Sequence, residues 1–258
     1  MSRFTGKVAL VTGGVGTIGI ECCRQFLAEG GSIVINSRNQ SRCDEASAVL
    51  AGEIDCADRI LAQAADISSF AECERLVAAS EERFGRLDHV IHCALSMIPG
   101  LQGPFEITDP SLYEEQMKQA ICSPMYLARA ALPALQRAGG GSILAFPSDA
   151  GKIAAPNQSI TGPTRAAVMM FFRSIALEFS AHAVRCNCIS PTYVDTPQLR
   201  AALASELHGK RMQSAVKRAK LGLPTPQEIA AMAMFLCSDN AAHLTGQVIS
   251  MNGGLSAA

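Results

Sequence analysis

The feature that most limits how this chain can fold is the alternation of short apolar runs with longer amphipathic ones. Runs rich in Val, Ile, Leu and Ala that end in turn residues predict buried strands, and the longer runs have the spacing of helices. The predicted strands are residues 7–13, 32–38, 59–68, 87–94, 142–148, 183–191 and 246–254. The predicted helices are residues 16–30, 41–52, 69–85, 110–138, 163–181 and 226–239.

This alternation predicts an α/β fold built on a parallel sheet of about seven strands. Because strands joined by helices pair in parallel, helices are expected on both faces of the sheet. Right-handed crossovers then give a doubly wound, Rossmann-like arrangement. Residues 1–258 contain no linker or internal repeat, which predicts a single domain. Pro124 and Pro133 are expected to interrupt the helix at 110–138.

Composition excludes several classes of function. A net charge of −1 over 258 residues gives no general attraction to nucleic acid or to an anionic membrane. The sequence has no apolar run of the ~18 residues that a membrane span needs, and no secretory leader precedes the first strand. The ten cysteines form no C-x-x-C pair and the histidines have no metal-binding spacing. We therefore expect a cytoplasmic protein with free thiols and no bound metal.

A glycine-rich turn, TGGVGTIG (12–19), stands between the first predicted strand and the first predicted helix. At such a junction, backbone N–H groups and the start of the helix can bind a pyrophosphate. Glycine allows the phosphate oxygens to come close to the backbone. The turn therefore predicts a dinucleotide site at this junction.

From this turn onward the chain resembles the short-chain dehydrogenase/reductase family along its whole length. The resemblance is carried by KVALVTGG (7–14), GRLDHVIH (85–92), ALPAL (131–135), GSIL (141–144), RCNCISP (185–191) and TGQVISMNGG (245–254). It implies hydride transfer between NAD(P) and an alcohol or ketone, and assembly into dimers or tetramers.

The family pattern T-G-x-x-x-G-x-G places Thr17 where the middle glycine belongs. Thr17 either obstructs the path of the pyrophosphate or donates a hydrogen bond to it, so dinucleotide binding is kept, weakened or lost. Ser37 and Arg38, after the second strand, resemble the version of the family that accepts NADP; the alternative is a solvated arginine in a turn. The cofactor contacts implied by the resemblance are Gly13, Thr17, Ile18, Gly19, Ser37, Arg38, Asp66, Ile67, Ala94, Arg165 and Thr196. Asp66 or Ser68 is alternatively a helix N-cap.

The resemblance weakens where the reaction would take place. Ser148 matches the catalytic serine of the family, but Thr161 and Arg165 stand where the family has its tyrosine and lysine. Ala120 stands at the position of the family's asparagine, and Thr192 at that of a glycine. Of the family's N-A-G motif only Ala94 matches, and Leu95 follows it.

These substitutions matter because of acid strength and reach. A phenol of pKa ~10 can be brought near neutral pH by a neighbouring ammonium group and then exchange a proton with the substrate. A threonine hydroxyl is a far weaker acid and is shorter than a phenol. Arg165 keeps a positive charge that could bind a ribose. Because no phenol is present, this charge has no phenol pKa to lower. The resemblance therefore implies a degenerate active site.

Three functions remain open at this stage. The first is a catalytically impaired subunit that assembles with itself or with an active relative. The second is an NADP-dependent alcohol or ketone oxidoreductase that uses Ser148 and takes its proton from water. The third is a non-redox lyase, dehalogenase or isomerase that uses Ser148, with His92 as a base and Asp149 orienting it.

Two further segments suggest partners. Residues 166–180 carry Met169, Met170, Phe171 and Phe172 in a row, so one side of this helix is expected either to face another subunit or to pack inside its own. Residues 198–222 occupy the place of the family's substrate lid and contain five basic side chains: Lys210, Arg211, Lys217, Arg218 and Lys220. This segment either binds an anionic ligand resembling acyl-CoA or is a solvated lid.

Overall fold

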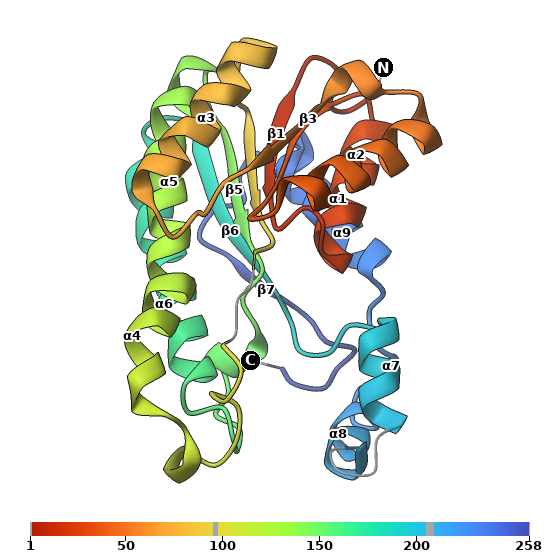
Figure 1. Cartoon of the computed structure of the whole chain (residues 1–258), viewed down its shortest axis with the longest axis vertical. Coiled ribbons are helices and arrows are strands. Elements are labelled where there is room, and N and C mark those ends of the chain that lie inside the picture. The colour runs from red at the N-terminus through yellow and green to blue at the C-terminus, as the bar shows by residue number, and fades with distance from the viewer. Residues whose placement is uncertain (1, 95–97, 205–208, 258) are drawn as a thin grey trace.

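A parallel sheet of seven strands forms the centre of the molecule, as predicted (Figure 1). The computed structural model describes residues 2–94, 98–204 and 209–257. The strand order is β3-β2-β1-β4-β5-β6-β7, so the sheet is doubly wound and its order reverses between β1 and β4. The strands are β1 (Val8–Thr12), β2 (Ser32–Ser37), β3 (Ile60–Ala64), β4 (His89–His92), β5 (Gly141–Ala145), β6 (Val184–Pro191) and β7 (Val248–Met251).

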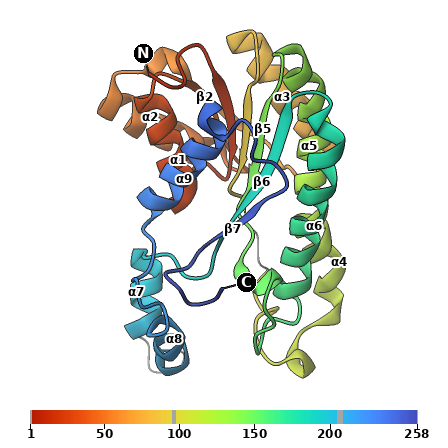
Figure 2. The same cartoon turned by 180° about the vertical axis from the view of Figure 1, so that it is seen from behind.

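Helices cover both faces of this sheet (Figures 1 and 2). One layer consists of α1 (Thr17–Ala28), α2 (Gln40–Ile54) and α9 (Pro226–Cys237). The opposite layer consists of α3 (Phe70–Phe84), α5 (Ser123–Arg137) and α6 (Thr161–Ser180). Short helical turns lie at Ala57–Arg59, Phe105–Ile107, Pro110–Leu112, Asp149–Gly151 and Asp239–Ala241.

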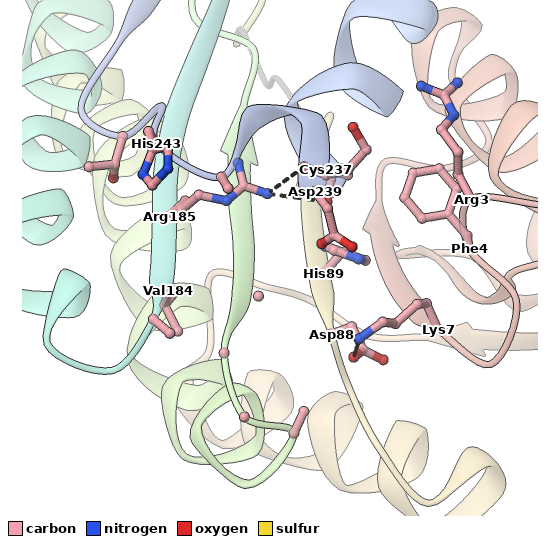
Figure 3. A pocket seen from close by; sticks show the side chains of 18 of the residues that line it. Arg3, Phe4, Lys7, Asp88, His89, Val184, Arg185, Cys237, Asp239 and His243 are labelled. Atoms are coloured by element: carbon pink, nitrogen blue, oxygen red, sulfur yellow. Dashed lines mark hydrogen bonds and ion pairs between the residues drawn. The ribbon is translucent and has the colours of Figure 1, made fainter.

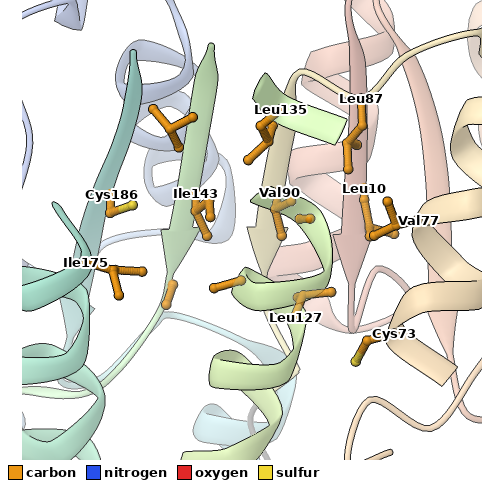
Figure 4. Packing of buried hydrophobic residues seen from close by; sticks show 14 of the residues in the cluster. Leu10, Cys73, Val77, Leu87, Val90, Leu127, Leu135, Ile143, Ile175 and Cys186 are labelled. Atoms are coloured by element: carbon orange, nitrogen blue, oxygen red, sulfur yellow. The ribbon is translucent and has the colours of Figure 1, made fainter. Parts of the chain in front are cut away.

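Side chains of the central strands alternate between the two layers. Leu10, Val90 and Ile143 pack with α3, α5 and α6, as Figure 4 shows. Their neighbours Val11 and Ile91 pack on the other face, against α1 and α9. Because both faces are buried, the strands read as continuous apolar runs rather than as alternating ones. This is why the sequence located all seven strands.

The helical segment before β5 differs from the prediction. It consists of α4 (Tyr113–Met117), a π-helical stretch at Lys118–Cys122, and α5. Pro124 cannot donate the usual helical hydrogen bond, and the wider turn lies directly before it, so the helix continues. Pro133 lies inside α5. The prediction that both prolines interrupt the helix was therefore wrong.

The third strand is shorter than predicted, because residues 65–68 form the turn into α3. The N-cap of α3 is Ser69, whose hydroxyl accepts a hydrogen bond from the amide of Glu72. Asp66 instead accepts one from the amide of Ser68, 3.0 Å away. The alternative that Asp66 or Ser68 caps this helix was therefore wrong.

The segment after β6 forms two helices, α7 (Pro197–Ala204) and α8 (Gly209–Val216). They lie beyond the carboxyl ends of the strands, apart from the two helix layers (Figures 1 and 2). In the described part of the chain, no helix is both long and apolar enough to cross a bilayer. All ten cysteines are free thiols, and all but Cys93 and Cys122 are buried.

Candidate functional site

The carboxyl ends of β1 and β4 lie side by side where the strand order reverses. Thr12, the last residue of β1, stands opposite His92, the last residue of β4. Sheets of this type bind their ligands outside the carboxyl ends of the strands at such a reversal. The glycine-rich turn follows β1 at this point, and Cys93 and Ala94 follow β4. A ligand-binding site is therefore expected at this junction.

The glycine-rich turn is held close to the end of β4. Gly13 has a φ of +67°, and a Cβ there would lie 2.6 Å from the amide nitrogen of Ala94. A Cβ on Gly19 would lie 2.2 Å from the carbonyl oxygen of Gly13. Gly16 is the N-cap of α1 and no side-chain hydrogen bond caps this helix. The first amide groups of α1 are thus available to an anion.

A cavity of about 450 Å³ opens beside this turn. Six of the residues predicted to contact a cofactor line it: Gly13, Ser37, Arg38, Asp66, Ile67 and Ala94. Arg42, Gln119 and Ser123 also line it and were not singled out from the sequence. Arg42 could have been found, because it lies four residues after Arg38 in the first turn of α2. Gln119 and Ser123 could not, because they come from the helix after β4.

The end of β2 presents hydroxyl and guanidinium groups to this cavity. The Ser37 hydroxyl donates to the carbonyl oxygen of Asn39, 2.9 Å away. The Asn39 side chain in turn accepts a hydrogen bond from the amide of Arg42 and caps α2. Arg38 and Arg42 are exposed at the rim of the cavity. Two positive charges therefore stand where an acid would hold the ribose of NAD.

The remaining predicted cofactor contacts do not themselves line this cavity, although Thr17 directly follows Gly16, which does. Thr17 is exposed as the first residue of α1, Ile18 is half-buried and Gly19 is buried. The Thr196 hydroxyl accepts a hydrogen bond from the amide of Leu199, 3.1 Å away, in the first turn of α7. Arg165 lines a separate, smaller cavity. The structure therefore places the predicted contacts in more than one group.

The turn that follows Ser148 packs against α6, the helix that carries Thr161 and Arg165. Ser148 precedes the turn at Asp149–Gly151, and its hydroxyl accepts a hydrogen bond from the amide of Ala150. This turn packs on α6: a Cβ on Gly151 would lie 2.6 Å from the amide nitrogen of Ala166 and 2.9 Å from Cβ of Arg165. Thr161 is the first residue of α6 and is 7% exposed.

The chain has three tyrosines, and none of them lies on α6. Tyr113 and Thr108 share a hydrogen bond of 2.6 Å between their hydroxyl groups. The ring of Tyr126 packs edge-on against Phe70. Tyr193 is half-buried and lies just after the carboxyl end of β6. The correspondence of Thr161 with the family's tyrosine stays a prediction.

Arg165 is fully buried, with 1% of its surface exposed. It lines a cavity of about 10 Å³ together with His92, Ala94 and Ala120. Within the described residues, its Nε atom has no hydrogen-bond partner. Burial lowers the pKa of Arg165 to about 10, so the guanidinium is charged at neutral pH.

His92 lies at the predicted end of the central strand. Its Nδ1 atom is 2.9 Å from the Thr12 hydroxyl. Burial, and secondarily the charge of Arg165, lowers the pKa of His92 to about 4. The imidazole is therefore neutral at physiological pH and is a weak base.

Asp149 does not orient His92, contrary to the sequence-based hypothesis. Its carboxylate instead accepts hydrogen bonds from the side chains of five residues: Ser190, Thr192, Ser250, Asn252 and Ser256. These residues come from the ends of β6 and β7 and from the segment after β7. Asp149 thus holds three segments together at the carboxyl ends of the strands.

Another cavity, of about 540 Å³, lies at the opposite end of the sheet (Figure 3). Arg185 lies there, and its guanidinium donates to the carbonyl oxygens of Leu236 and Cys237 at the end of α9. His89 lies 2.9 Å from the Ser142 hydroxyl. Because the Arg185 and His89 side chains already have partners and the cavity is at the amino ends of the strands, the carboxyl-end cavities are the better candidates. Within the described residues, no three His, Cys, Asp or Glu side chains gather as a metal site would require.

Comparisons with known proteins agree with this fold. Residues 14–256 match the model of a family described as enoyl-(acyl carrier protein) reductase. The chain is 28% identical to 7alpha-hydroxysteroid dehydrogenase of Bacteroides fragilis, with 99% of this chain and 96% of that protein covered.

Solved structures are also similar over nearly the whole chain. A short-chain type dehydrogenase/reductase from Mycobacterium ulcerans matches with a TM-score of 0.91 at 29% identity, covering 98% of this chain and 90% of that one. A 7 alpha-hydroxysteroid dehydrogenase complexed with NADH and 7-oxo glycochenodeoxycholic acid matches with a TM-score of 0.85 at 26% identity, covering 98% and 95%. The chain belongs to the short-chain dehydrogenase/reductase family.

Proposed function

We propose that this chain binds NADP at the carboxyl ends of β1 and β2 but transfers hydride poorly, and that it acts mainly as a subunit of an assembly. The observation that carries the proposal is Thr161, a buried threonine at the start of α6, in the position where the family resemblance expects a phenol. A bound dinucleotide would supply hydride chemistry, whereas the chain itself must supply the proton.

The residues present fit the adenosine and pyrophosphate parts of a dinucleotide. The close approach at Gly13 and Gly19 leaves no room for side chains between the turn and the end of β4. The uncapped start of α1 offers amide groups to the pyrophosphate. Asp66 and Ile67 line the far part of the cavity, where an adenine would lie. These features support binding even though Thr17 replaces a glycine.

Arg38 and Arg42 favour NADP over NAD. Both guanidinium groups stand at the rim of the cavity beside the end of β2. A guanidinium can form paired hydrogen bonds with a phosphate and balance its charge. An NAD site would instead use a carboxylate at Ser37 or Arg38 to hold the ribose diol. The 2′-phosphate of NADP therefore has suitable partners here.

The weak point is proton transfer. Thr161 offers an aliphatic hydroxyl, and Ala120 offers no polar group in the adjoining π-helical stretch. His92 is a poor substitute because its pKa is lowered to about 4. Loss of acid–base help alone typically slows an enzyme by roughly 10²–10⁴-fold. Ser148 is retained and can still polarise a carbonyl group.

A titration of NADPH and NADH into the purified chain, followed by fluorescence or calorimetry, tests binding directly. The proposal predicts saturable NADPH binding that is at least about tenfold tighter than NADH binding, a difference of ~1.4 kcal/mol. Binding of neither nucleotide, or tighter binding of NADH, would contradict it. Loss of binding when Gly13 is changed to Val would locate the nucleotide in the glycine-rich turn.

The relatives support a second candidate, a genuine NADP-dependent oxidoreductase acting on an alcohol or ketone. The proteins matched by sequence and structure are named as dehydrogenases. In that case Ser148 would polarise the carbonyl group and water would deliver the proton. NADPH consumption that disappears in Ser148→Ala but survives in Thr161→Val would favour this candidate.

The non-redox alternative has less support. A lyase or isomerase would need His92 to remove a proton, yet its Nδ1 lies beside the Thr12 hydroxyl and its imidazole is buried. Asp149 is hydrogen-bonded elsewhere and does not raise the basicity of this histidine. The non-redox alternative would be supported if the chain turned over a substrate without nucleotide and His92→Ala abolished that turnover.

Assembly is proposed through α6. Met169 and Phe172 are buried inside the subunit, but Met170 and Leu177 are 59% and 79% exposed. Positions seven apart lie on the same side of a helix, so these two apolar side chains share one exposed face of α6, here called the α6 stripe, with the exposed Arg173 and Ser174 between them. A second copy of this chain, or a relative with the same helix, would cover this stripe. The many free thiols suit a reducing cytoplasm.

We also propose that the lid segment, residues 198–222, binds an anionic ligand. Lys217, Arg218 and Lys220 are exposed just after α8. The side chains of Lys210 and Arg211 lie outside the described part of the chain. A ligand with an acyl-CoA-like phosphate would find these charges on its way to the site.

A further inference from the structure

Arg165 is a charged side chain that lies inside the subunit. Among the described residues, it has the largest volume of the fully buried side chains, and only 1% of its surface is exposed. Within the described residues, its Nε atom has no hydrogen-bond partner and no ion pair involves its guanidinium. Leaving such a charge uncompensated inside a protein is costly, and native structures normally supply a partner or bind one.

The guanidinium lies against an enclosed space. This cavity has a volume of about 10 Å³, which is about enough for one water or a monatomic ion. Apart from Arg165 and His92 its lining is apolar: Ala94, Ala120, Ala145, Phe146, Pro147 and Val168. Ala94 also lines the larger cavity, so the two spaces adjoin.

The groups around this cavity supply no negative charge. His92 is neutral at physiological pH because burial holds its pKa near 4. The Asp149 carboxylate, on the turn that packs against Arg165, is occupied by donors from the ends of β6 and β7. The cavity therefore carries about one positive charge that the described residues leave unbalanced.

We propose that this cavity is a binding site for a small monovalent anion, held by the guanidinium of Arg165. The anion is either a free halide-sized ion or the carboxylate of a small-molecule ligand that enters through the adjoining cavity. A single charge and an apolar wall disfavour a phosphate, which would be larger and doubly charged. The site would convert the reaction end of the chain into an anion-selective pocket. The inference does not depend on how fast the chain transfers hydride.

Thermal unfolding at constant ionic strength, without nucleotide, tests the site. Gluconate would be replaced stepwise by bromide in one series and by acetate in another. A bound anion stabilises the folded state by an amount that grows with its concentration. We expect the unfolding midpoint to rise and saturate in the wild type and in Arg75→Met, whose arginine is exposed on α3, but not in Arg165→Met. An equal rise in Arg165→Met, or none in the wild type with either anion, would overturn the proposal.

Crystals soaked in bromide give a second readout that does not need the variant to fold. An anomalous peak beside the Arg165 guanidinium identifies a free ion as the occupant. Stabilisation by acetate but not bromide, with carboxylate density at the same place, identifies a ligand carboxylate. Density for water alone, with no anion-dependent stabilisation, would show that the charge is simply tolerated. Because neither readout involves turnover or NADP, these results stand apart from those for the proposed function.

Discussion

Asp149 and Arg165 are close in the fold but have opposite electrostatic surroundings. The Asp149 carboxylate accepts hydrogen bonds from the ends of two strands and from the C-terminal segment. Arg165 has the volume of a large core side chain, and within the described residues its Nε atom has no hydrogen-bond partner. Asp149 therefore holds segments of the fold together, whereas the Arg165 guanidinium can still bind a ligand. Both lie where the sequence resemblance expects catalysis.

Asp149→Asn should destabilise the fold. An amide keeps one acceptor but turns N–H groups toward the donors around it, including Asn252 at 2.5 Å and Ser190 at 2.7 Å. We expect a loss of roughly 2–4 kcal/mol in the free energy of unfolding, measured in urea. Asp195→Asn, which removes only an exposed ion pair with Arg200, serves as the control and should have little effect. Equal effects of the two changes would contradict an anchoring role.

The same carboxylate should make stability depend on pH. Burial alone would raise the pKa of Asp149, but hydrogen bonds from Asn252, Ser190, Thr192 and Ser250 outweigh it and hold the pKa below its usual value. A lowered pKa stabilises the folded state above the unfolded-state pKa of about 3.9, and this stabilisation is lost as the pH falls further. Unfolding midpoints below about pH 4 should therefore fall more steeply in the wild type than in Asp149→Asn.

Arg38 and Arg42 should govern nucleotide choice. Changing both to alanine removes the two guanidinium groups at the end of β2. NADPH binding should weaken by roughly tenfold or more, while NADH binding should change little. Arg200→Ala, an exposed arginine on α7, is the matched control. Parallel losses for both nucleotides would show that the pair acts through the fold rather than on a phosphate.

At the scale of elements, the turn between β1 and α1 combines fold and binding in one segment. Gly19 packs its Cα face against the backbone of Gly13, and Gly13 packs against the end of β4. The glycines were found from the sequence because their spacing is a local pattern. The π-helical stretch at Lys118–Cys122 was not, because it depends on how a proline is accommodated within one continuous helix.

Gly19→Ala tests this turn. A Cβ at position 19 would lie 2.2 Å from the Gly13 carbonyl oxygen, so the backbone must shift. Both stability and NADPH affinity should fall. Gly52→Ala is the control, because Gly52 lies in α2 with no atom within 4 Å of the added Cβ. That change should raise stability by up to about 1 kcal/mol, since alanine favours a helix. Indifference of NADPH binding to Gly19→Ala would argue against a pyrophosphate at this turn.

At the scale of the whole molecule, the sheet separates a structural end from a functional one. At the amino ends, Arg185 and His89 have partners within the protein. At the carboxyl ends, the start of α1 is uncapped and Arg165 is unpaired within the described residues. The α6 stripe, with Met170 and Leu177 exposed, is the surface through which we propose that copies join.

Leu177→Glu should disrupt assembly. A charge at position 177 of the α6 stripe would be buried by a second copy without a partner. We expect light scattering to show a mass near that of one subunit, while far-UV circular dichroism remains unchanged. Leu221→Glu is the control, because Leu221 is 90% exposed but lies outside α6. If the wild type is itself a monomer, or both variants keep the assembled mass, this surface is not the interface.

The sequence was sufficient for the sheet and for one half of the candidate site. Strands such as β1 and β5 are buried on both faces, so their apolar character is visible residue by residue. The surroundings of Asp149 and Arg165 could not be predicted in this way. Their partners, or the lack of them, are set by segments up to 107 residues apart that meet only in the folded chain.

We propose that Thr161 is too weak an acid to supply the proton that hydride transfer needs. The most direct test compares NADPH oxidation by the wild type and by the double variant Thr161→Tyr, Arg165→Lys, with saturating NADPH and the same panel of ketones. The account predicts a wild-type rate near background and a rate at least about 100-fold higher in the double variant for one or more ketones. A wild-type turnover of ~1–10³ s⁻¹, unchanged or reduced in the double variant, would contradict it.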